Sequence, residues 1–532
     1  MKRATRLFLL LGLACQPNSE TSSSTSRSVL PMVALDNSVA YVDSSSGSTF
    51  LLDPADPALK PRILPTGKSP LAAVKRKGAN QLLVLTHGDQ GSASTAPEPA
   101  RLVLIDPASG AAQASYDLPG RYDQLAQSDD GVFAVLTYGS ASSGASGSML
   151  YNPNDLEVVR LDGKQPPLAS RPIRSLGSVP IGVRFSPRTT LFGQPRTLAV
   201  VSAVNYVTLL DLDNAQHTEI TVPLVPDGKQ TVTPAQILFD MTGLVVYVRA
   251  DGSNDLFQIS LAQSTPADSS SNDFRVSLSL IGSGSAPSDM GMFGTGDKMR
   301  IAVTAPGAQQ LVILDPKTGN ATPVPAGAQV NRILLFQGPS PKSSEIQDRA
   351  MLAGVGTGAT VLVFADLQNI ETAQGLAIES WSLPAPISDI TPLPGNLALL
   401  THQYGYGGAA FSIVNLADRT IEPIGSSGAL DDVTVETAAP SRLWGTDGAN
   451  RMEYLDLAGN LQGREVILDQ TIVSITPLAS KSGDGKRHLV LEMDDPMNVG
   501  YLTVLDADQP DRKGARSAYG FLLTDYLERG QP

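Results

Sequence analysis

The chain has 532 residues and a formal net charge of −13, with 48 glycines, 39 prolines and one cysteine. An acidic chain lacks the basic face that nucleic-acid binding requires, and it is not expected to adhere to anionic lipid head groups. A glycine or proline falls about every six residues, which excludes a protein built on long amphipathic helices.

The N-terminus has the pattern of a secretory signal. Residues 1–6 carry three positive charges, and residues 7–14 are apolar. A short apolar run after a basic start is typical of a signal peptide. Eight apolar residues are too few to cross a bilayer core, which takes about 20 in a helix. We therefore expect residues 1–14 to be a signal peptide, and we expect no transmembrane segment.

Cys15 follows the small residue Ala14 and is the only cysteine, so it cannot form an internal disulfide. The stretch Leu11-Gly12-Leu13-Ala14-Cys15 resembles the lipobox of bacterial lipoproteins, with Gly12 where that family usually has leucine. The resemblance implies that Cys15 carries acyl chains, palmitate among them, as a stable membrane anchor. It also implies sorting to the outer membrane, because Gln16 rather than aspartate follows. A plain secretory signal with an incidental cysteine is the alternative.

Residues 15–31 are expected to form a tether, because a Ser/Thr-rich segment cannot pack a core. Loss of the signal would bring the net charge near −16, since the signal carries Lys2, Arg3 and Arg6. Residues 32–532 are the expected folded domain.

That domain shows short apolar runs bounded by turn residues, which is the signal for β-strands. Many runs end in a shared phrase of apolar residues, then aspartate, then a turn. The aspartates that end these phrases are Asp53, Asp106, Asp162, Asp211, Asp315, Asp366, Asp456 and Asp506. Two further units keep the strand without the aspartate, at Ile259 and Val414.

Ten units result, spaced by about 50 residues, and that period is typical of β-propellers with four-stranded blades. In one unit, we expect strands at residues 183–185, 198–201, 207–210 and 220–222. Its middle strands are apolar on both faces, as in blades stacked face to face. Ten blades exceed the usual range of roughly 4 to 8. One continuous array is favoured, while two rings, or a decorating hairpin counted as a blade, remain open.

The phrase Ile105-Asp106-Pro107-Ala108-Ser109-Gly110 recurs as Leu314-Asp315-Pro316-Lys317-Thr318-Gly319. These phrases resemble β-propeller repeats of the YVTN type and, more loosely, PQQ-like repeats. Residues 443–451 resemble an NHL-type repeat. The resemblance covers roughly residues 33 to 520 and implies an all-β propeller architecture, with no particular function.

Several long polar loops join the second and third strands of their units, and all are expected on one rim. Loops on a rigid scaffold commonly carry binding residues, and tyrosine is favoured at interfaces. The candidate binding residues on these loops are His87, Asp89, Tyr138, His402, Tyr404, Tyr406, Asp494 and Asp495.

His87 and His402 stand at equivalent repeat positions, in Leu85-Thr86-His87 and Leu400-Thr401-His402. Four histidines and no ligand cluster predict no metal site, because zinc needs three or four converging ligands. The recurring aspartates are interpreted as turn caps and not as a ring of functional carboxylates.

We find no nucleophile elbow, phosphate loop, dinucleotide fingerprint or zinc motif, and expect no cofactor. The leading hypothesis is a lipid-anchored envelope lipoprotein that binds another protein through its propeller. The alternative is an envelope enzyme or carbohydrate-binding propeller with its site on the rim or in the central channel.

Overall fold

The computed structural model describes residues 29–519. Within that span, it leaves out 90, 92–95, 140–151, 174–178, 215, 217–218, 226–229, 266–271, 340–344, 384, 407–408, 425–429, 438–440, 460, 462 and 495–499. Cys15, the expected signal peptide at residues 1–14 and residues 15–28 of the expected tether lie outside this description.

The described chain forms ten four-stranded antiparallel sheets and one extra hairpin. Blade 1 contains β1 (Val33–Ala34), β2 (Val39–Asp43), β3 (Ser48–Leu52) and β4 (Arg62–Pro65). Blade 2 contains β5 (Pro70–Lys75), β6 (Leu82–Thr86), β7 (Arg101–Asp106) and β8 (Ala111–Asp117). Blade 3 contains β9 (Gln124–Gln127), β10 (Phe133–Thr137), β11 (Asp155–Arg160) and β12 (Leu168–Pro172).

The next three blades follow the same order. Blade 4 contains β13 (Gly182–Phe185), β16 (Leu198–Ala203), β17 (Tyr206–Asp211) and β18 (Ile220–Pro223), with the hairpin β14 (Thr189–Leu191) and β15 (Gln194–Arg196) inserted. Blade 5 contains β19 (Thr233–Phe239), β20 (Val245–Asp251), β21 (Asp255–Gln263) and β22 (Phe274–Gly282). Blade 6 contains β23 (Asp289–Phe293), β24 (Arg300–Ala305), β25 (Gln310–Asp315) and β26 (Asn320–Pro325).

The last four blades complete the array. Blade 7 contains β27 (Arg332–Pro339), β28 (Ile346–Ala353), β29 (Val361–Asp366) and β30 (Ile378–Ser382), and blade 8 contains β31 (Ile387–Leu393), β32 (Leu397–Tyr406), β33 (Ala409–Asn415) and β34 (Thr420–Ile424). Blade 9 contains β35 (Asp432–Glu436), β36 (Arg442–Thr446), β37 (Arg451–Asp456) and β38 (Arg464–Ile467), and blade 10 contains β39 (Thr471–Pro477), β40 (His488–Asp494), β41 (Gly500–Asp506) and β42 (Arg516–Ala518). The described helical turns are α1 (Gln374–Ala377), η2 (Gly296–Lys298), η3 (Pro306–Ala308) and η4 (Arg512–Gly514).

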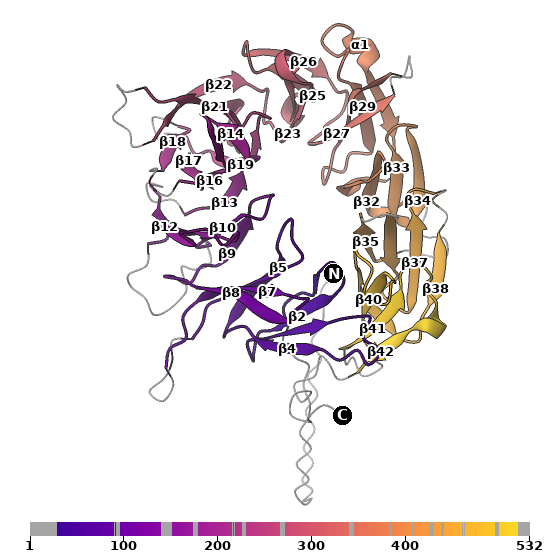
Figure 1. Ribbon diagram of the computed structural model, residues 1–532. Helices are drawn as coiled ribbons and strands as arrows, with labels where there is room; N and C mark the ends of the chain where they lie inside the picture. The colour runs from indigo at the N-terminus through magenta and orange to yellow at the C-terminus, as the bar shows by residue number, and fades with distance from the viewer. Residues whose placement is uncertain are drawn as a thin grey trace, which may run out of the picture.

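The ten sheets are blades of one β-propeller, arranged as a ring with the first strand of each blade toward the centre (Figure 1). The second and third strands are apolar runs buried on both faces, as β6 and β17 illustrate. The fourth strand is the outermost, and β8 is mostly exposed. The prediction of an all-β propeller with ten units is confirmed.

The ring closes where blade 10 packs against blade 1. Val39, Tyr41 and Phe50 share one buried cluster with Val490 and Leu502. The Ser480 amide also donates to the Asp36 carbonyl at 2.7 Å. Blade 1 draws all four strands from one end of the array and blade 10 draws all four from the other. Closure therefore rests on packing between complete blades, and the two-ring alternative is wrong.

The four strands expected in the fourth unit match β13, β16, β17 and β18 closely. The additional β14–β15 hairpin lies between the first and second of these strands. It is an insertion within blade 4, so no decorating hairpin was counted as a blade.

The recurring aspartates lie at the ends of the third strands or just after them, and their side chains cap the following turns. In six blades the Oδ1 atom accepts the backbone amide two residues on, at 2.9–3.0 Å. These six residues are Asp53, Asp106, Asp211, Asp315, Asp456 and Asp506. The interpretation of these residues as turn caps is confirmed, since an aspartate that bonds its own turn needs no external ligand.

Two rims follow from the strand order. One end of the ring carries the turns between second and third strands and the connections between blades, and we call this end the BC rim. The AB rim is the opposite end, with the turns between first and second and between third and fourth strands. No helix among the described residues is both long and apolar enough to cross a membrane.

Candidate functional site

The sequence-predicted residues that the structure describes lie at the BC rim. His87 and Tyr138 each follow the second strand of their blade, His402 lies in β32, and Asp494 ends β40. Asp89 follows His87 and pairs with Glu98 across the loop. Tyr404 and Tyr406 belong to β32, but their side chains lie outside the description, as does all of Asp495.

His87 joins blade 2 to blade 3. Its Nε2 atom is 3.0 Å from the Tyr122 carbonyl oxygen and 3.3 Å from Asp123 Oδ1. The two side chains remain about a quarter exposed, at 26% and 23%. Gly88 shapes the turn after His87, with φ at +66° and no room for a side chain against the Glu98 carbonyl. His87 and Asp123 thus form a solvent-accessible polar pair between blades 2 and 3.

Beneath this pair lies a buried tyrosine pair. The rings of Tyr122 and Tyr138 are 4.7 Å apart, and both side chains are buried. Burial and the nearby Glu157 carboxylate raise the pKa of Tyr122. Because Tyr138 is only 7% exposed, it supports the rim from below and presents little surface to a partner.

Glu157 is a buried acid behind the tyrosines. It is 1% exposed, and its Oε2 atom accepts a hydrogen bond from the Ser170 hydroxyl at 2.6 Å. Burial raises the pKa of the Glu157 carboxyl, although Ser170 opposes the shift. His87 and Asp123 are thus the accessible groups of this junction, and Tyr122, Tyr138 and Glu157 form its buried support.

His402 has a different environment from His87. It is 6% exposed, and its Nε2 atom is 2.7 Å from the Ser412 hydroxyl. Burial lowers the pKa of the His402 imidazole. The structure thus places this candidate rim residue inside blade 8.

The predicted equivalence of His87 and His402 within the repeat is wrong by one residue. In blade 8 the residue opposite Ile387 is His402, whereas in blade 2 the residue opposite Pro70 is Thr86. The structural counterpart of His402 is therefore Thr86, which is also buried. A shift of one residue in a strand turns the side chain to the other face, which explains the two environments.

The remaining candidates do not converge on one site. Asp89 forms an ion pair with Lys68 at 3.0 Å and accepts the Gly91 amide at 3.1 Å. Asp494 lies in blade 10, opposite Thr471 and Gly500. Blades 9, 10 and 1 separate His402 from the His87 junction. Among the described residues, no group of three or more histidine, cysteine or acidic side chains could hold a metal ion.

The structure adds a feature that sequence reasoning missed. Four inner strands carry a β-bulge at their BC-rim end, and each bulge leaves one extra residue unpaired. The extra residues are Leu71, Ala235, Ser388 and Val473, and all four are exposed. Bulges re-aim side chains and are frequent beside functional sites. The sequence did carry a signal for two of these bulges, at Pro70 and Pro234, because proline inside a strand often marks a bulge.

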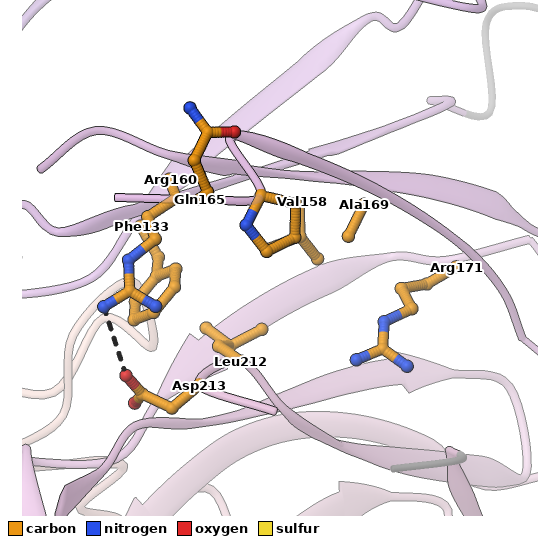
Figure 2. A pocket seen from close by; sticks show the side chains of 9 residues that line it. Phe133, Val158, Arg160, Gln165, Ala169, Arg171, Leu212 and Asp213 are labelled. Atoms are coloured by element: carbon orange, nitrogen blue, oxygen red, sulfur yellow. Dashed lines mark ion pairs between the residues drawn. The ribbon is translucent and has the colours of Figure 1, made fainter. Parts of the chain in front are cut away.

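A small pocket lies elsewhere, between blades 3 and 4 at the AB rim (Figure 2). Arg160 points toward Asp213, with a closest nitrogen-to-oxygen distance of 3.6 Å, and it also pairs with Asp162 at 2.8 Å. Arg171 lies across the pocket and donates to the Asn214 carbonyl at 3.0 Å. The two carboxylates offset the charge of Arg160, so this pocket is a poor anion site.

No protein-family model matches this chain, and no curated protein matches it. Solved structures do match. Dihydro-heme d1 dehydrogenase NirN in complex with DHE has 11% identity and a TM-score of 0.40, over 81% of this chain and 73% of that chain. Apo AztD from Citrobacter koseri has 14% identity and a TM-score of 0.30, over 60% and 81%. These likenesses concern the propeller fold alone.

Proposed function

We propose that this chain is a lipid-anchored extracytoplasmic lipoprotein, with propeller repeats of the YVTN type, that binds another protein of the cell envelope through its BC rim. The signal-like residues 1–14 and the lone Cys15 support the lipid anchor on the outer membrane. A ten-bladed ring supports a scaffold role, because it presents a broad, rigid face on which loops can bind.

The choice of the BC rim as the binding surface rests on three exposed apolar side chains. Leu71, Ile181 and Val473 lie at the inner edge of the BC rim with exposed fractions of 39%, 41% and 49%. Leu71 and Val473 are bulge residues, and Ile181 directly precedes β13. Protein interfaces typically place apolar anchors at the centre and polar residues around them. Here the polar surroundings include His87, Asp123 and Asp431.

The experiment is a crosslinked affinity purification of the tagged protein from its own membranes. The test variant is Leu71→Asp with Val473→Asp. The control is Leu280→Asp with Ile467→Asp, which changes somewhat more exposed apolar residues, at 57% and 55%, on the outer strands β22 and β38. We expect a stoichiometric protein partner with the wild type and the control, and at least a tenfold loss with the rim variant.

Cys15→Ser tests the anchor in the same experiment. It should release the protein from the membrane fraction and reduce recovery of the partner. Clean recovery of the wild type without any partner would contradict the proposal, and so would equal capture by the rim variant and its control.

The second candidate function is an enzyme or carbohydrate-binding propeller, and the His87–Asp123 pair favours it. Both side chains reach solvent at the BC rim over the buried carboxyl of Glu157. Binding to a glycan array followed by His87→Ala and Asp123→Asn would test it. Loss of glycan binding in both variants, with folding retained, would favour this function over protein binding.

A further inference from the structure

The N-terminal segment joins the propeller at the inner edge of the BC rim. Val29 forms an antiparallel bridge with Asp43, the last residue of β2, and the Leu30 amide donates to the Val42 carbonyl at 2.9 Å. The second strand of each blade ends at the BC rim, so Val29 lies at that rim. Val29 therefore lies on the inner side of β2 in blade 1, at the BC-rim end of that strand.

The length of that segment limits how far the rim can stand from an anchor at Cys15. Fourteen peptide steps separate Cys15 from Val29. Fully extended, they span at most about 50 Å. The AB rim is farther along the ring axis by the length of a six-residue strand such as β7, which is about 20 Å.

We infer that the BC rim faces the membrane and that its partner is a membrane protein bound in the gap between the propeller and the bilayer. This inference rests on the proposed lipid anchor. The attachment point brings the BC rim nearer to the bilayer than the AB rim, although both rims belong to one rigid ring. His87, Asp123 and the bulge residues Leu71 and Val473 then all face the membrane.

The charges on this rim favour a protein over lipid as the occupant. Asp431 and Asp432 are exposed at the BC rim, whereas the exposed Asp251 is paired with Arg249 at 2.7 Å. Carboxylates are repelled by the negative surface potential of anionic lipids. The rim is therefore expected to stand off the bilayer, which leaves room for an extracytoplasmic segment of a membrane protein.

Two single-cysteine variants of the full lipidated protein test the orientation, because Cys15 is consumed by the anchor. Asp431→Cys places a donor dye at the BC rim, and Ala458→Cys places it in an exposed AB-rim turn of the same blade. The protein is reconstituted in phosphatidylcholine vesicles that carry an acceptor dye on a lipid head group. We expect at least twofold higher transfer efficiency from position 431 than from position 458.

Equal efficiencies, or the reverse order, would overturn the inference while leaving the anchor intact. Failure of the anchor is seen separately, because the wild type would then float free of the vesicles as Cys15→Ser does. Adding phosphatidylglycerol should leave transfer from position 431 unchanged or lower. A rise would mean that the rim lies on lipid and would overturn the assignment of the occupant.

A photocrosslinking amino acid at the same two positions tests the occupant in native membranes. An integral membrane protein crosslinked from position 431 and not from position 458 is the expected result. A soluble protein crosslinked from position 431 would overturn the inference.

Discussion

The Tyr41 hydroxyl in blade 1 faces the Glu492 carboxylate in blade 10, across the seam where the first and last blades meet, and it lies 2.8 Å from Met32 Sδ. Tyr41 is fully buried, and Glu492 also accepts the Ser474 hydroxyl at 2.8 Å. Burial and the Glu492 charge raise the pKa of Tyr41. The seam therefore joins apolar packing to a polar contact that only the closed ring can form.

We expect Tyr41→Phe to lower the free energy of unfolding by about 1 kcal/mol, because it removes one polar partner of Glu492 while the Ser474 hydroxyl still donates to that carboxylate. Urea unfolding followed by tryptophan fluorescence would measure the loss. Tyr206→Phe is the control, since Tyr206 is only half-buried in blade 4, and it should change stability by less than about 0.5 kcal/mol. Equal losses in both variants would show that the seam contact contributes nothing special.

A buried ion pair links blades 9 and 10. Arg487 and Glu436 are 4% and 2% exposed at the side chain, and Glu436 also accepts the Trp444 indole at 3.0 Å. Arg487→Met should cost about 3–5 kcal/mol, because it strands a buried carboxylate. Replacing both, as Glu436→Gln with Arg487→Met, should recover most of that loss. A double variant as unstable as the single one would contradict this account.

The same pair predicts a pH dependence. Burial raises the pKa of Glu436 above its ordinary value, so the folded state holds that proton more tightly than the unfolded chain does. Protonated Glu436 contributes its full stability below the pKa that this residue has in the unfolded chain. That contribution is lost as the pH rises through the pKa of Glu436 in the folded state. The deficit of Arg487→Met should therefore be smaller near pH 5 than near pH 8, as urea midpoints at the two values would show.

His402 should give the opposite dependence of stability on pH, because it is a base. Burial lowers the pKa of His402 below 6.5, so the unfolded chain binds its proton first as pH falls. The wild type should lose up to about 1.4 kcal/mol per pH unit below pH 6.5 through this residue. His402→Asn, which keeps a polar partner for Ser412, should remove that part of the loss. Parallel urea curves at about pH 7.5 and about pH 5 would test it, and identical pH sensitivity in both proteins would refute it.

We expect substitution of a turn aspartate to change the stability of the fold and not the binding of a partner. Asp106→Ala removes the acceptors for the Ala108 and Ser109 amides, at 3.0 and 3.3 Å, and should cost about 1 kcal/mol. Asp106→Asn retains an acceptor oxygen and should recover most of the stability. Partner capture should be unchanged in both variants, and a loss of capture in the folded Asn variant would indicate a functional carboxylate.

Local sequence signals were sufficient for the strands, the ten units and the turn caps. An apolar run such as residues 198–203 specifies a strand buried on both faces, and an aspartate before a turn bonds the turn itself. Each of these features depends on neighbours within a few residues along the chain. The placement of His87 and Tyr138 on the BC rim could also be predicted, because their loops follow the second strand of the repeat.

Other properties were decided only by tertiary structure. The counterparts His402 and Thr86, the bulges at Leu71 and Val473, and the partner that Asp123 provides for His87 all depend on register between strands or on packing between blades. Repeat phrases locate a residue only to within a position or two, yet one residue reverses the face of a strand. By itself, the sequence therefore determined the propeller and its turns, while pairing across strands and blades decided which side chains reach the rim.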